Sequence, residues 1–153
     1  MNALLLAIAL PLGGGSLIGY ITALRGGFRN NKLQKPSWQP PDWVFGPVWT
    51  ILYIMMGIAS WLLWRALPST ARSVALALYA TQLALNFAWT PVFTSGHIKT
   101  ALGVLIALDI AVLALLGSSY AVSGWATALL IPYVIWLGVA TSLNVYYARN
   151  IST

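Results

Sequence analysis

Few side chains in this sequence could carry acid–base or metal chemistry. The acids are Asp42 and Asp109, the single histidine is His97, and there is no cysteine. One histidine cannot form a metal site by itself, so His97 is either an axial haem ligand or a solvated loop residue. These residues do not assemble a hydrolytic triad, a carboxylate pair or a phosphate-binding loop. We therefore predict no metal site and no catalytic acid or base.

Asp109 is the one acid that falls deep inside an apolar segment. A charged side chain at the centre of a membrane-spanning helix costs roughly 2.5–3.5 kcal/mol on insertion scales. We expect the Asp109 carboxyl to be protonated or hydrogen-bonded, with the Gln82 amide as its candidate partner. A functional role and a structural role both remain open, and without a second buried acid or base a proton relay is not supported.

Aromatic rings dominate the remaining chemistry of the sequence. Residues 35–49 read KPSWQPPDWVFGPVW and place three tryptophans and four prolines in one short stretch. Proline fixes φ, lacks the amide hydrogen and keeps its predecessor out of the helical region. The stretch therefore predicts a rigid extended cap, followed by a helix with Asp42 as its N-cap residue. Tryptophan and tyrosine faces can stack on flat ligands, and their N–H and O–H groups can orient polar substituents.

The composition indicates the class of protein that contains these residues. Of 153 residues, 59% are hydrophobic and 7% are charged, and the mean hydropathy is +0.81. One soluble core could not hide that much apolar surface, so we predict an integral membrane protein. A span needs about 20 apolar residues, which leaves room for about five. The net charge of +6 comes from residues at the ends of apolar segments, which does not favour a nucleic-acid partner.

We predict a single domain over residues 1–153, an all-α membrane bundle capped by the proline-rich loop. The expected helices, the first of them retained rather than cleaved as a signal peptide, cover about 2–24, 44–67, 71–93, 98–116 and 124–149. The basic residues are unequally distributed between the two sides of the membrane. Arg65 and Arg72 lie on one side, and six basic residues lie on the other: Arg25, Arg29, Lys32, Lys35, Lys99 and Arg149. By the positive-inside rule, loop 25–41 and the C-terminus face the cytoplasm and the N-terminus faces away.

This topology predicts a pocket for a flat, largely apolar ligand in the cytoplasmic half. Separate segments bring small, aromatic and amide residues to one depth there: Gly19, Thr22, Phe45, Trp49, Asn86, Trp89, Ala140, Leu143 and Asn144. For Trp38 and Trp43 an interfacial aromatic belt is an equal alternative. The small pair Gly15 and Gly19 permits either close helix packing or ligand contact.

Three motifs resemble one known family, the translocator protein or tryptophan-rich sensory protein (TspO) family. They are LQKPSWQPPDWVFGPVW at 33–49, QLALNFAWTPVF at 82–93 and PYVIWLGVATSLN at 132–144. The resemblance implies a five-helix membrane fold, commonly a homodimer, in a bacterial, mitochondrial outer or other organelle membrane. It also implies binding of porphyrins such as protoporphyrin IX, of isoquinoline and benzodiazepine-type drugs and, in some members, of cholesterol. No cofactor is required; porphyrin is the ligand.

The resemblance also implies the residues of the ligand site. The family's site residues correspond here to Gly19, Thr22, Phe45, Gly46, Trp49, Asn86, Trp89, Trp136, Ala140 and Leu143. We add Trp38 from the cap and Tyr53 and Asn144 from the helix faces to the predicted ligand site. An enzymatic alternative is light- and oxygen-dependent porphyrin breakdown, in which Trp49, Trp89 and Trp136 stabilise radicals. A third alternative is a sterol- or lipid-binding or partner-docking bundle.

The sequence departs from the family pattern at three places. Arg29, Asn30 and Asn31 replace an aromatic pair, and Thr100 or Ala101 stands where animal members have a ligand-contacting tryptophan, which predicts a roomier pocket. Val145 replaces the tyrosine that follows Leu-Asn. The sterol pattern of Leu143, Tyr146 and Arg149 therefore uses a tyrosine turned about 100° around the helix, which disfavours steroid binding.

Overall fold

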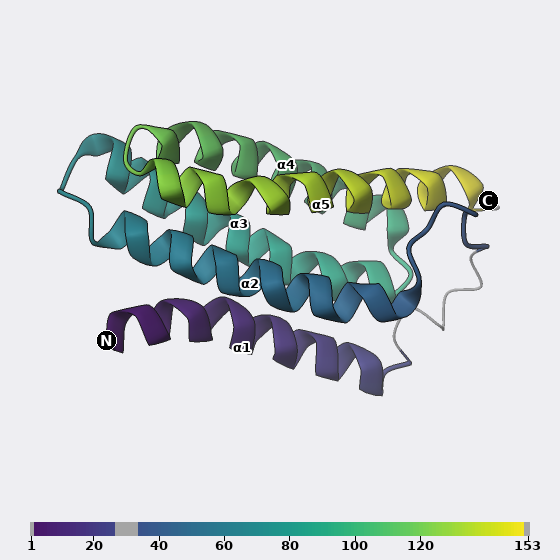
Figure 1. Cartoon of the computed structure of the whole chain (residues 1–153). Helices are drawn as coiled ribbons and strands as arrows, with labels where there is room; N and C mark the ends of the chain where they lie inside the picture. The colour runs from purple at the N-terminus through teal and green to yellow at the C-terminus, as the bar shows by residue number, and fades with distance from the viewer. Residues whose placement is uncertain (1, 27–33, 152–153) are drawn as a thin grey trace.

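The computed structural model describes residues 2–26 and 34–151, and these form five helices and no strand (Figure 1). The helices are α1 (Asn2–Leu24), α2 (Asp42–Trp64), α3 (Thr70–Thr94), α4 (Ile98–Tyr120) and α5 (Gly124–Asn150). The predicted all-α bundle is confirmed. Arg29 and Lys32, which were predicted to face the cytoplasm, lie outside the described residues. So does the departure from the family pattern at Arg29–Asn31.

The bounds of α2 and α4 differ most from the prediction: α2 ends at Trp64 rather than near residue 67, and α4 ends at Tyr120 rather than near residue 116. α2 begins at Asp42, and Pro41, which has no polar side chain, occupies the N-cap position. The predicted N-cap role of Asp42 was therefore wrong, and its carboxylate is bound by Lys35. α4 continues to Tyr120, and the hydroxyls of Ser118 and Ser119 bond to carbonyls of the preceding turn. These bonds give both hydroxyls a partner within the helix.

Helices α1, α2, α4 and α5 are each long and apolar enough to cross a membrane. α3 has 25 residues but is less apolar, since it carries Gln82 and Asn86, both buried inside the bundle. A span of this length can carry such amides when neighbouring helices supply their partners. The chain is therefore an integral membrane protein whose α3 is adapted to the interior of the bundle.

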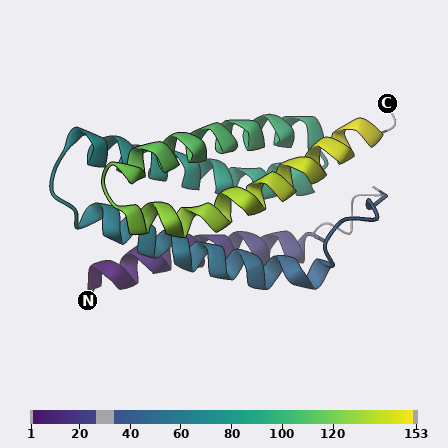
Figure 2. The same ribbon diagram turned by 45° about the horizontal axis from the view of Figure 1, so that its top comes forward.

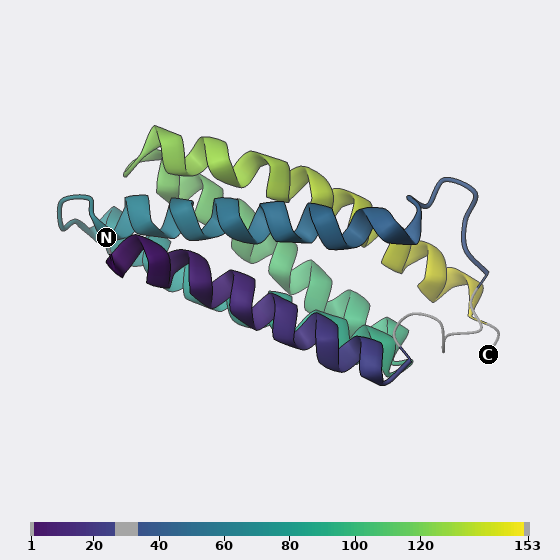
Figure 3. The same ribbon diagram turned by 60° about the horizontal axis from the view of Figure 1, so that its bottom comes forward.

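The helices follow one another around the bundle in the order α1, α2, α5, α4, α3, and α3 also touches α1. Figures 2 and 3 show this arrangement from two further directions, and the N- and C-termini lie at opposite ends. The larger apolar core fills the end next to the α2–α3 and α4–α5 connections, with Met56, Leu63, Leu108, Leu115 and Leu130 fully buried. The other end holds a smaller core between α3, α4 and α5.

α1 and α2 approach each other closely at Gly57 of α2. A Cβ atom there would lie 2.5 Å from the Cα atom of Ile8 and 2.7 Å from the Ala7 carbonyl oxygen. Both are backbone atoms of α1, so they cannot move aside as a side chain could. Only glycine lets α1 lie this close to α2, which agrees with the use of small residues in membrane helix packing.

We expect Gly57→Ala to lower the unfolding free energy by about 1–3 kcal/mol, because the added methyl group forces α1 away from α2. Thermal unfolding of the detergent-solubilised protein measures the change. Gly103→Ala is the matched control, since a Cβ atom at Gly103 of α4 meets nothing within 4 Å. Equal melting temperatures for the two variants would contradict the close α1–α2 contact.

Candidate ligand-binding site

A cavity of about 1220 Å³ lies between α1, α2, α3 and α5 at the end of the bundle where the C-terminus lies. Residues of the 34–41 segment close part of its rim, and α4 contributes none of the residues that line it. Twelve of the residues predicted for ligand binding line this cavity: Gly19, Thr22, Phe45, Gly46, Trp49, Tyr53, Asn86, Trp89, Trp136, Ala140, Leu143 and Asn144.

Trp38 is the predicted site residue that the structure leaves outside the cavity. Its ring packs edge-on against Tyr146, with ring centroids 6.2 Å apart, and its side chain is 52% exposed. Trp43 is 75% exposed and also lies outside the cavity lining. Both indoles therefore occupy positions typical of residues at a membrane–water interface.

Aromatic rings line the cavity as two neighbouring pairs, which form its aromatic walls. Trp49 and Tyr53 of α2 stack with ring centroids 5.5 Å apart. Phe45 of α2 and Trp136 of α5 meet edge to face at 5.4 Å. These offset and edge contacts hold the rings in fixed orientations. The walls are thus rigid, flat and apolar.

A chain of buried hydrogen bonds fixes the helices below these walls. The Tyr53 hydroxyl donates to Asn86 Oδ1 at 2.7 Å, and Asn86 Nδ2 donates to the Tyr133 hydroxyl at 2.8 Å. The Tyr133 hydroxyl donates in turn to Gln82 Oε1 at 2.8 Å. Because Tyr53, Asn86 and Tyr133 come from α2, α3 and α5, this relay joins three helices at one level. Buried polar groups need such partners to be tolerated in a bundle.

A second set of bonds uses the amide of Asn144. Its Oδ1 accepts from Trp89 Nε1 at 2.9 Å, and its Nδ2 donates to the Ile98 carbonyl at 3.1 Å. The Trp89 N–H is therefore occupied and cannot orient a ligand. For Trp49 and Trp136 no partner of the indole N–H is present in the described part of the chain. These two groups are the indole donors that a ligand in the cavity can use.

The glycines of the predicted site provide space. A Cβ atom at Gly19 or Gly46 would meet nothing within 4 Å, so both positions widen the cavity. Gly15 behaves differently, because a Cβ atom there would collide with the Tyr53 ring. Both members of the small pair line the cavity, and Gly15 in addition makes room for the Tyr53 ring.

The expected extra room at the start of α4 is absent. Ala101 is fully buried in the smaller core, next to Phe93 and Leu143, and neither Thr100 nor Ala101 lines the cavity. α4 packs against α3 and α5 on their far side, so its first turn does not reach the ligand space. That prediction was wrong.

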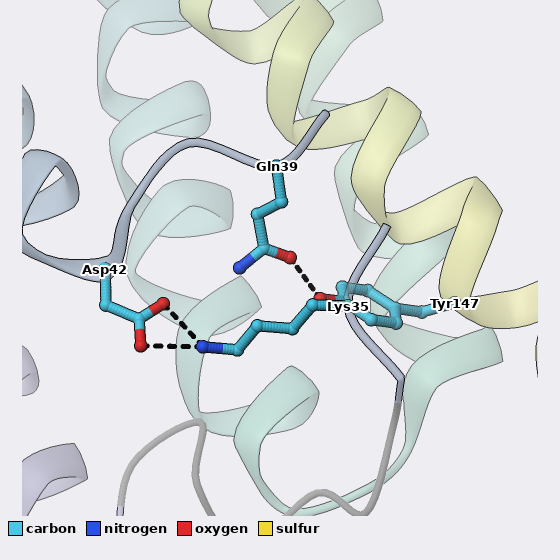
Figure 4. A network of polar contacts seen from close by, with 4 residues as sticks. All are labelled: Lys35, Gln39, Asp42 and Tyr147. Atoms are coloured by element: carbon cyan, nitrogen blue, oxygen red, sulfur yellow. Dashed lines mark hydrogen bonds and ion pairs between the residues drawn. The ribbon is translucent and has the colours of Figure 1, made fainter. Parts of the chain in front are cut away.

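Four polar residues at the rim were not predicted as site residues (Figure 4). They are Lys35 and Asp42, which form an ion pair at 2.7 Å, and Gln39 and Tyr147, which share a hydrogen bond. Opposite charges seven residues apart in a proline-stiffened stretch were an available signal for the ion pair. The Gln39–Tyr147 contact joins residues 108 positions apart and had no signal in the sequence.

Asp109 and His97 both lie outside the lining of this cavity. Asp109 Oδ2 accepts from the Thr141 hydroxyl at 2.7 Å, not from Gln82, which faces Met56 and Tyr133 instead. The predicted Gln82 partnership was therefore wrong. His97 stands at the N-cap of α4, with Nδ1 3.1 Å from the Ser95 hydroxyl. Over residues 2–26 and 34–151, no three His, Cys, Asp or Glu side chains come together as a metal site would require.

We expect Tyr133→Phe to lower the unfolding free energy by about 1–2 kcal/mol, because Asn86 Nδ2 and Gln82 Oε1 then lose their partner. Tyr120→Phe is the matched control, since the Tyr120 side chain is 76% exposed. Thermal unfolding of both variants measures the difference. A Tyr133→Phe variant with the same melting temperature as the wild type would contradict a stabilising role of the relay.

Comparison with known proteins assigns this architecture to a family. The human translocator protein is 46% identical over 115 residues, which are 73% of this chain and 68% of that protein. The tryptophan-rich sensory protein of Cereibacter sphaeroides is 41% identical over 115 residues, 74% and 71% of the two chains. The tryptophan-rich protein TspO of Chlorobaculum tepidum is 36% identical over 150 residues, 94% and 95% of the two chains. Because residues 7–149 also match the TspO/MBR family, the chain belongs to that family of membrane proteins.

Proposed function

We propose that this TspO-family protein binds porphyrins such as protoporphyrin IX in the cavity between α1, α2, α3 and α5, to sense, sequester or translocate them. The observation that carries the proposal is a cavity of about 1220 Å³ with aromatic walls. Pockets for drug-sized ligands measure about 300–1,000 Å³, so this one has room for a larger planar molecule. The N–H groups of Trp49 and Trp136 add two directional donors.

The same walls suit smaller flat ligands of the isoquinoline and benzodiazepine type, which would fill part of the cavity. We also propose that the rim and the C-terminus face the cytoplasm, as the distribution of basic residues favours. A homodimer is the expected assembly. Binding of this kind needs no cofactor, since stacking and hydrogen bonding supply the affinity.

Titration with protoporphyrin IX in the dark tests the binding proposal. We expect saturable quenching of tryptophan fluorescence, because Trp49, Trp89 and Trp136 line the cavity. Trp136→Phe should raise Kd about three- to fivefold, since it removes a donor and part of an aromatic face worth about 1 kcal/mol. Trp125→Phe is the matched control on the same helix, because Trp125 is 78% exposed and lies outside the cavity lining.

Two results would contradict the binding proposal. Absence of quenching would mean that the aromatic residues only pack the bundle, as in a lipid-binding or partner-docking protein. Equal losses of affinity in Trp136→Phe and Trp125→Phe would place the ligand elsewhere on the protein.

A second candidate function is the light-driven breakdown of bound porphyrin by oxygen. It is favoured by one observation, the placement of three oxidisable indoles, Trp49, Trp89 and Trp136, around a single cavity. With no acid–base group on the apolar walls, electron transfer from tryptophan would have to carry such a reaction.

Illumination of the saturated complex separates the two functions. If the protein degrades porphyrin, its absorbance bands should fade faster with the wild type than with the Trp49→Phe, Trp89→Phe or Trp136→Phe variants, each at a porphyrin concentration that keeps its site full. If all samples bleach at the rate of porphyrin in detergent alone, the enzymatic candidate fails and the binding proposal stands.

A further inference from the structure

The rim of the cavity carries two residues of opposite charge. Among the described residues that line it, only Lys35 and Asp42 are charged. Lys35 Nζ donates to both oxygens of Asp42, at 2.8 and 2.7 Å. Figure 4 shows the pair at the segment that leads into α2. A lysine whose bonds go to a carboxylate at the edge of an apolar cavity is already arranged to bind a carboxylate.

We propose that Lys35 is the specificity-determining residue of this cavity and binds a carboxylate of the ligand in place of Asp42. The inference rests on the proposed function and deepens it. The preferred ligand is then a flat, apolar acid, whose ring system lies between the aromatic walls and whose carboxylate lies at the rim.

The ion pair is suited to exchange because it is accessible to water. The side chains of Lys35 and Asp42 are 53% and 69% exposed. Exposed pairs of this kind contribute little to stability, since water screens the charges and the long side chains lose freedom. A ligand carboxylate that arrives at the rim can therefore replace Asp42 at small cost.

Asp42 does not lose all stabilisation when Lys35 turns away. It is the first residue of α2, where the helix dipole and free N–H groups favour a negative charge. Lys35, in contrast, makes its side-chain hydrogen bonds only to Asp42 among the residues that the structure describes. The exchange thus leaves Asp42 at a favourable place and gives the ligand the Lys35 ammonium group.

A second donor is held beside the first. The Tyr147 hydroxyl donates to Gln39 Oε1, which directs the Gln39 amide nitrogen away from α5 and toward the Lys35–Asp42 pair (Figure 4). That nitrogen has no hydrogen-bond partner in the part of the chain that the structure describes. An ammonium and an amide N–H can bind one carboxylate together, and hydrogen bonds to a charged group are the stronger kind. Tyr147 acts here as a positioning residue for Gln39.

The test compares protoporphyrin IX with its dimethyl ester, which keeps the ring system but has no ionised carboxylate. Both are titrated in the dark at neutral pH against the wild type, Lys35→Gln and Lys99→Gln. Lys99 is the matched control, because it is an exposed lysine at the same end of the bundle and does not line the cavity. We expect Lys35→Gln to raise Kd for the diacid about tenfold and to leave Kd for the ester unchanged. Lys99→Gln should change neither.

Asp42→Asn distinguishes carboxylate binding from a purely structural ion pair. If Lys35 binds the ligand, this variant frees it from its competitor, so Kd for the diacid should fall while Kd for the ester stays the same. If the ion pair only holds the rim in shape, Lys35→Gln and Asp42→Asn should both weaken the diacid and the ester to the same extent. That result, or equal affinities of Lys35→Gln and wild type for the diacid, would overturn the inference.

The same titrations separate failure of this inference from failure of the proposed function. Wild-type protein that binds neither diacid nor ester would overturn both. Wild-type protein that binds both ligands equally, with no effect of Lys35→Gln on their ratio, would overturn the role of Lys35 and retain porphyrin binding by the aromatic walls.

Discussion

The fold depends on the need of buried polar groups for partners. Asn86 is almost fully buried in α3, where an unpaired amide would be costly, and it bonds to Tyr53 of α2 and Tyr133 of α5. The Tyr133 hydroxyl in turn donates a hydrogen bond to Gln82 Oε1. Apolar contacts between membrane helices allow many registers, whereas this relay is satisfied in one. Three helices are therefore fixed at the level that forms the floor of the cavity.

α1 has two different roles along its length. Gly57 allows α1 to approach the backbone of α2 closely near Ile8. Toward the C-terminal end of α1, Gly19 and Thr22 line the cavity, and a Cβ atom at Gly19 would meet nothing within 4 Å. α1 has few buried residues, so it serves as a wall rather than as part of the core. One part of α1 therefore packs on α2, and another part bounds the cavity.

The rim differs from the walls in charge and in strength of attachment. The walls are rings and amides held by contacts between helices. The 34–41 segment is held by one exposed ion pair, by the Gln39–Tyr147 bond and by the edge contact of Trp38 with Tyr146. A turn closed by the Gln39 N–H and the Pro36 carbonyl at 3.1 Å stiffens it. Recognition of a polar group on the ligand can therefore occur at the rim without disturbing the walls.

The sequence by itself determined the membrane class, the five helices and about half of the described residues that line the cavity. Helix length and hydropathy are local properties, and the shared depth of Trp49 and Asn86 follows once the direction of each span is known. Trp136 was predicted from the family resemblance. Only the tertiary structure decided which groups bond to one another. In the structure, Asp109 accepts a hydrogen bond from Thr141, and Trp38 packs on Tyr146 outside the cavity. These outcomes depend on helix rotation and register, which arise from many small contacts between residues far apart in the chain.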